Sequence, residues 1–178
     1  MKKKAQDLLN IMGEHIMNFS DFYKENVDDI HNLNTGNLYP QGTGGRERSL
    51  NVSPVLSRLN ESVERYNEKL FVEDVPALRK FIEEVSEEQG EDSYYVKDLS
   101  VCLQKVMKCD LSEISVLTDT KFFKSNSDVF IKELKAIRVA CHEVLGILSD
   151  IPFLNGGVDA LYETMNSARS AHRSESMA

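Results

Sequence analysis

The chain has 178 residues, of which 41% are hydrophobic and 28% charged, and its formal net charge at pH 7 is −8. A chain of this length buries enough surface to form a core without metals or disulfides, and its apolar content excludes wholesale disorder. The acidic balance argues against nucleic acid or an anionic membrane surface as a ligand, because basic residues that neutralise phosphates supply most of that affinity.

The first segment is strongly amphipathic. Its apolar residues recur every three or four positions, which predicts one long helix over residues 4–33; they are Leu8, Met12, Ile16, Phe19, Tyr23, Val27 and Ile30. The next segment, 34–50, holds four of the nine glycines and one of the four prolines. We therefore expect a long, irregular and mobile loop there.

Three further helices are predicted in the middle of the chain. Ser53 has the character of an N-cap and Pro54 that of a first helical residue, so a second helix is expected to begin there. A third helix is expected to begin near Pro76 and a fourth to cover about 93–108. The capping-box pattern from Asp110 to Glu113 predicts a short helix to about residue 117.

A heptad pattern marks the last third of the chain. Apolar residues alternate spacings of four and three over 127–150; they are Phe130, Leu134, Ile137, Cys141, Val144, Leu148 and Ile151. Pro152 ends this helix, a last helix covers about 158–168, and the small polar residues 169–178 are expected to form a flexible tail.

These elements predict an all-α fold, because no segment alternates apolar and polar residues as a strand does. We expect a bundle of four to six helices with two long amphipathic staves and coiled-coil-like packing, in a single domain over 1–168. No apolar run approaches the roughly 20 residues that a membrane span needs. Cytoplasmic location is the expectation, with export through a specialised secretion system as the alternative.

The cysteines and histidines form no local metal-binding pattern. Cys102 and Cys109 are two helical turns apart, which is a core spacing, and no Cys-x-x-Cys pair or Glu-x-x-His motif is present. We expect Cys102, Cys109 and Cys141 to be buried free thiols. The sequence therefore predicts no metal, no cofactor and no catalytic residue.

The expected function is a non-catalytic protein–protein interaction module, such as an adaptor, secretion chaperone, effector or regulator. The first helix carries apolar residues beside its main stripe, so Met12, Met17 and Phe22 are candidate partner-binding residues. Glu87 and Glu88, in an acidic segment, are candidates for contact with a basic partner. A homo-oligomer formed through the same surfaces is the alternative.

A second candidate function rests on the glycine-rich segment 42–49, in which Arg46 and Arg48 follow three glycines. This segment resembles the Gly-x-Leu-Arg-Ser loop of bacterial GTPase-activating effectors, although it lacks the Leu-Arg pair. The resemblance implies a regulator that presents an arginine to a partner's nucleotide site.

Overall fold

The computed structural model describes residues 2–35, 45–111, 120–154 and 156–177. Its helices are α1 (Lys2–Thr35), α2 (Gly45–Lys69), the π-helical turn η1 (Leu70–Asp74), α3 (Val75–Gln89), α4 (Tyr94–Met107), α5 (Thr120–Ser149), the 3-10 turn η3 (Pro152–Leu154) and α6 (Gly157–Met177). No strand occurs in these ranges. The predicted all-α class is therefore confirmed.

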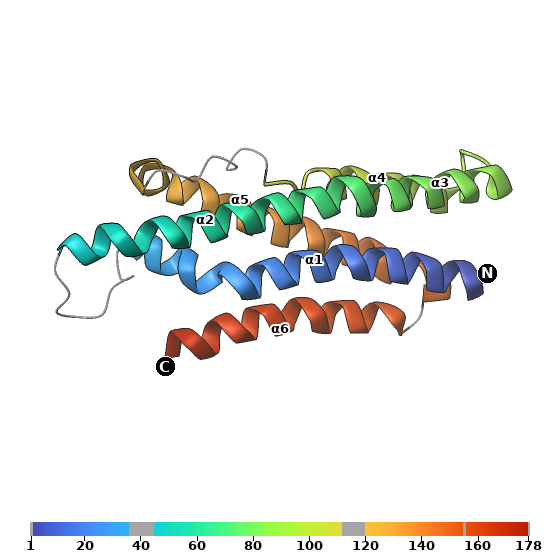
Figure 1. The fold of residues 1–178 in the computed structure, drawn as a ribbon. Coiled ribbons are helices and arrows are strands. Elements are labelled where there is room, and N and C mark those ends of the chain that lie inside the picture. The colour runs from blue at the N-terminus through green and yellow to red at the C-terminus, as the bar shows by residue number, and fades with distance from the viewer. Residues whose placement is uncertain (1, 36–44, 112–119, 155, 178) are drawn as a thin grey trace.

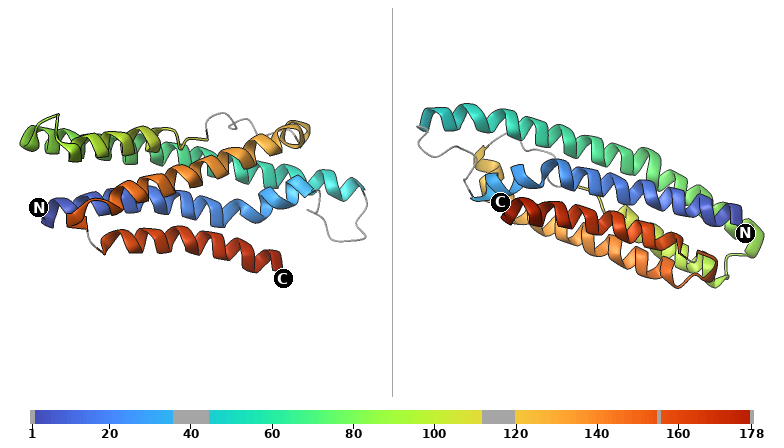
Figure 2. Two further views of the ribbon diagram at one scale, coloured as in Figure 1. Left: turned by 180° about the vertical axis from the view of Figure 1, so that it is seen from behind. Right: turned by 90° about the horizontal axis from the view of Figure 1, so that it is seen from below.

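Helix α1 is the central element of the bundle. It packs against α6, α2 and α5, and its N-terminal half also contacts η1 and α3. In Figure 1 the run α2–η1–α3 lies on one side of α1 and α6 on the other, and the second view of Figure 2 shows α5 beside α6. Helix α4 returns along α3 and also contacts α5.

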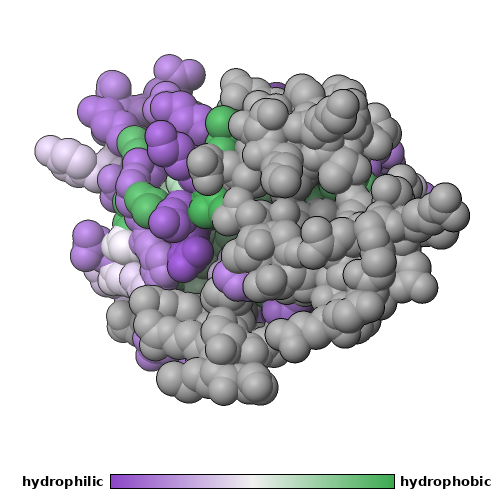
Figure 3. Space-filling model, turned by 90° about the vertical axis from the view of Figure 1, so that its left-hand side faces the viewer, coloured by the Kyte–Doolittle hydropathy of each residue, from purple (hydrophilic) through white to green (hydrophobic). Residues whose placement is uncertain are grey.

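The predicted stripes form the core. The apolar residues expected to face inward on the first, second and heptad helices are all buried; they include Ile16, Phe19, Tyr23, Leu59, Val63, Phe130, Leu134, Ile137, Cys141 and Leu148. The knobs-into-holes packing of a coiled coil stays a prediction. Seen from the left-hand side of Figure 1, the described surface is mainly hydrophilic, with small separate hydrophobic areas (Figure 3).

The start of the second helix was predicted wrongly. Helix α2 begins at Gly45, so Ser53 is not its N-cap and Pro54 lies inside the helix. An interior proline removes one backbone hydrogen bond, a cost of about 3 kcal/mol. Pro54 is exposed, and the buried stripe that follows it stabilises the helix. The remainder of the predicted loop, 36–44, lies outside the described residues.

The second and third predicted helices are joined by η1 rather than by a loop. The Val75 amide donates to the Leu70 carbonyl, five residues back, so this hydrogen-bonded turn contains one residue more than an α-helical turn. Pro76 follows directly and would collide with the carbonyl of Val72 in a regular α-helix. The wider turn relieves that collision and places both Asp74 and Val75 on the buried face.

The other boundaries differ less. Gly90 ends α3 with a φ of 87°, and its amide donates to the Ser86 carbonyl at 2.8 Å. Helix α6 continues to Met177, although the sequence predicted an end at 168 and a flexible tail. The short helix expected over 110–117 lies largely outside the described residues. No helix of the described chain combines the length and apolarity that a bilayer span requires.

Candidate functional site

The core contains a small group of polar residues, and two of them stand apart. Asn26 donates to Ser62 Oγ at 2.7 Å and to a backbone carbonyl at 2.9 Å, so its amide group is satisfied. His15 and Asp74, which are 1% and 3% exposed, are different. His15 Nδ1 and Asp74 Oδ2 face each other at 4.0 Å, and neither atom has a hydrogen-bond partner. Unpaired buried polar atoms are costly, which makes this pair a candidate functional feature.

Two thiols complete the group around His15. The Nε2 atom of His15 lies 4.0 Å from Cys141 Sγ, although the two residues are 126 positions apart. The side-chain ligand atoms of His15, Cys109 and Cys141 all lie within 4.8 Å of one another, and all three residues are buried. We call these three residues the His–Cys centre.

The helices explain how the His–Cys centre forms. His15 adjoins Ile16 in the buried stripe of α1, and Cys141 occupies a heptad position of α5. Cys109 follows the end of α4, where its amide donates to Val106 at 3.0 Å. Tyr66 of α2 donates its hydroxyl to the Cys109 carbonyl at 2.6 Å. Three separate helical segments thus supply the three side chains, and a fourth fixes the backbone of Cys109.

The electrostatics distinguish the two thiols of the centre from the third cysteine. A hydrogen bond from Cys141 lowers the pKa of Cys109 to about 6, with further help from His15 and against the effect of burial. The same interaction, together with burial, raises the pKa of Cys141 well above its usual value. Burial raises the pKa of Cys102 to about 12. Cys109 is therefore the more acidic thiol of the pair, and burial disfavours ionisation of Cys102.

Asp74 connects the His–Cys centre to the surface. Burial raises the pKa of its carboxyl group, and the charges of Lys69 and His15 oppose that rise. Lys69 Nζ lies 3.5 Å from Asp74 Oδ1, 2.9 Å from Glu14 and 3.4 Å from Glu73. Lys69 thus covers Asp74 from the solvent side and balances its charge.

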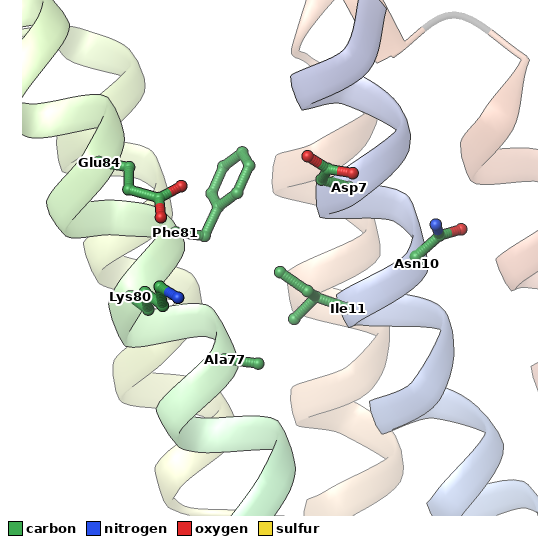
Figure 4. Close-up of a pocket in the computed structure, with 7 residues that line it drawn as sticks. All are labelled: Asp7, Asn10, Ile11, Ala77, Lys80, Phe81 and Glu84. Atoms are coloured by element: carbon green, nitrogen blue, oxygen red, sulfur yellow. The ribbon is translucent and has the colours of Figure 1, made fainter.

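A surface groove runs between α1 and α3, beginning at Asp74. One cavity of about 320 Å³ is lined by Asp74 and its charged neighbours, and the next, of about 360 Å³, by Asp7, Lys80, Phe81 and Glu84. Both cavities share Asn10, Ile11 and Ala77, so they form one continuous depression, which we call the α1/α3 groove. In Figure 4, Phe81 and Ile11 project into the space between the helices, and Asp7 and Glu84 lie near the Phe81 ring.

The partner-binding residues predicted on α1 do not share one surface. Met12 and Phe22 are buried, so the expectation that they form an exposed docking face was wrong. The reason is that α1 is the central helix and has neighbours on several sides. Met17 is 44% exposed, and its part in binding a partner stays a prediction.

The charged candidates lie elsewhere. Glu87 and Glu88 are exposed near the end of α3, and Glu88 forms an ion pair with Lys4 of α1. Arg46 and Arg48 belong to the first turns of α2, and the placement of their side chains lies outside what the structure describes. The structure therefore neither groups these four residues nor joins them to the α1/α3 groove.

The sequence prediction missed the His–Cys centre. Its only local signal was a histidine beside the buried stripe of an otherwise apolar helix face. The spacing of the two cysteines carried no further signal, because their meeting depends on how α4 and α5 pack against α1. Comparison with known proteins adds no assignment: no family model matches the chain, and no significant similarity links it to a curated protein or to a solved structure.

Proposed function

We propose that this protein is a non-catalytic interaction module that binds a basic, amphipathic segment of a partner protein in the α1/α3 groove. The observation that supports the proposal most directly is the chemistry of the groove. Its floor is apolar, formed by Ile11, Ala77 and Phe81, and carboxylates line its borders.

The apolar floor suits a helix or extended segment that buries aliphatic side chains. Grooves of this kind accept anchors spaced by three or four residues along an amphipathic helix. Asp7 and Glu84 are exposed beside Phe81, where they can pair with lysine or arginine. Lys80 is the cation at this end of the groove, and Lys69 at the other end is already paired with acidic groups.

The overall charge of −8 supports the same class of partner. A negative field speeds the approach of a basic segment and disfavours an acidic one. Because rim charges act mainly on the association rate, we expect binding to weaken as the salt concentration rises.

The proposal is tested with a defined probe, a fluorescent 14-residue peptide of leucine and lysine arranged as an amphipathic helix. Fluorescence anisotropy should show saturable binding that weakens with salt. A scrambled peptide of identical composition and a leucine–glutamate analogue should bind at least about tenfold more weakly, a difference of about 1.4 kcal/mol.

Two charge reversals separate the groove from general electrostatic attraction. Glu84→Lys in the groove should weaken binding about tenfold or more. Glu83→Lys is the matched control, since Glu83 is its exposed neighbour on α3 outside the groove lining. Equal losses in the two variants, or equal binding of the scrambled peptide, would refute the groove as the binding site.

The alternative function, presentation of Arg46 or Arg48 to a nucleotide site, gains no support from the described residues. No side-chain contact of either arginine is described, and residues 36–44, which precede α2, lie outside the structure's described ranges.

A further inference from the structure

We infer that the His–Cys centre is a zinc site, in which His15, Cys109 and Cys141 bind one Zn²⁺, a water molecule takes the fourth tetrahedral position and Asp74 orients His15. Zinc prefers thiolate and imidazole ligands in a tetrahedral arrangement. The inference is independent of the proposed partner binding, because it concerns the interior of the bundle rather than the groove.

The distances are close to those that zinc requires. Zinc lies about 2.3 Å from sulfur and about 2.0 Å from nitrogen, so tetrahedral ligand atoms are separated by about 3.5–3.8 Å. His15 Nε2 and Cys141 Sγ are 4.0 Å apart, and all three ligand atoms lie within 4.8 Å of one another. Rotamer adjustments of less than about 1 Å therefore bring the three atoms to a common ion.

The unpaired atoms of His15 and Asp74 fit the same arrangement. When Nε2 binds a metal, the proton resides on Nδ1, which then needs an acceptor. The Nδ1 atom faces Asp74 Oδ2 at 4.0 Å, and both atoms lack any other partner. Many zinc sites contain a carboxylate that accepts a hydrogen bond from a zinc-bound imidazole and so fixes its orientation. Asp74 is therefore a positioning residue rather than a ligand.

Charge balance favours zinc over a monovalent soft ion. Two thiolates and a neutral imidazole around Zn²⁺ give a neutral group, whereas Cu⁺ leaves a buried net charge of −1. Buried uncompensated charge is strongly unfavourable. Lys69 offsets part of the negative charge of Asp74 outside this group.

Asp74 links the His–Cys centre to the α1/α3 groove. Asp74 lines the α1/α3 groove together with Glu14 and Glu73, and its other face approaches His15. The acidic lining of the groove attracts a divalent cation toward Asp74. The bound ion would connect α1, the end of α4 and α5, so zinc should raise the melting temperature.

The test uses the full chain with its thiols reduced, and zinc as the probe. Competition with a chromophoric chelator should give one zinc per chain. Cys109→Ser and Cys141→Ser should each weaken zinc binding at least about 100-fold. Cys102→Ser is the matched control, because Cys102 is also a buried free thiol but lies outside the His–Cys centre, and it should change the affinity less than about threefold.

Two further measurements guard against misfolded variants. Cobalt added to the unmutated protein should give the ligand-field bands of a tetrahedral site and a thiolate-to-metal charge-transfer band. Asp74→Asn should weaken zinc binding about 10- to 100-fold while leaving the cobalt spectrum of the loaded protein unchanged. That combination identifies a positioning role, since loss of a ligand would alter the spectrum.

The zinc assignment is overturned if the reduced, folded protein binds no stoichiometric zinc. It is equally overturned if cobalt binds without thiolate charge transfer, or if Cys102→Ser loses as much affinity as Cys109→Ser. If the reduced protein fails to bind zinc and a Cys109–Cys141 disulfide forms in air, the pair would be assigned to redox chemistry instead.

Discussion

Tyr66→Phe tests how firmly the core of the bundle holds the segment that follows α4. Tyr66 is among the largest fully buried side chains, and its hydroxyl donates to the Cys109 carbonyl at 2.6 Å. Its ring also packs against Phe22, with centroids 5.5 Å apart. Phenylalanine keeps the ring contact and removes only the hydrogen bond.

The expected loss follows from that single change. Removing one partner from a buried hydrogen bond leaves the other desolvated, at a cost of about 1–3 kcal/mol. With a urea dependence of about 1–3 kcal/mol per molar, the midpoint of unfolding should fall by about 1 M, within bounds of about 0.3–3 M, at an unchanged slope. Circular dichroism during urea titration measures both quantities.

Tyr94→Phe provides the control, since Tyr94 is 86% exposed and its ring stays available to Lys97 at 5.9 Å. Its free energy of unfolding should change by less than about 0.5 kcal/mol. If Tyr66→Phe costs no more than Tyr94→Phe, the hydroxyl does not hold Cys109 and the placement of that segment is wrong.

Three other stability predictions follow from burial and backbone geometry. Ile137→Ala should lower the free energy of unfolding in urea by about 2–5 kcal/mol, whereas Val139→Ala, at a position 54% exposed, should lower it by less than about 0.5 kcal/mol. Similar losses would contradict the assignment of Ile137 to the buried face of α5. Phe22→Ser should lower the melting temperature strongly, and Met17→Ser should leave it nearly unchanged, because only Phe22 is buried. Calorimetry measures both, and a larger loss for Met17→Ser would contradict the burial of Phe22. Gly146→Ala should stabilise α5 by about 0.5–1 kcal/mol, since an added Cβ meets no atom within 4 Å, and a loss of stability would contradict that open environment.

Helix periodicity in the sequence was enough to predict the fold class and most of the core. Positions such as Leu59, Ile137 and Leu148 repeat at helical spacing, and a side chain on such a stripe must be covered in a folded chain. The boundaries depended on weaker local signals. Ser53 and Pro54 have the form of a helix start, yet the helix begins earlier, at Gly45.

Only the tertiary structure decided which apolar surfaces are covered and which distant polar groups meet. The sequence left open whether α1 is peripheral or central; its contacts with several helices bury Met12 and Phe22. His15, Cys109 and Cys141 each have an unremarkable local setting. They meet because α1, the end of α4 and α5 converge at one level of the bundle, and the π turn beside them places Asp74 within reach of His15. Local periodicity specifies the face of a helix, whereas the relative register of packed helices depends on the whole core.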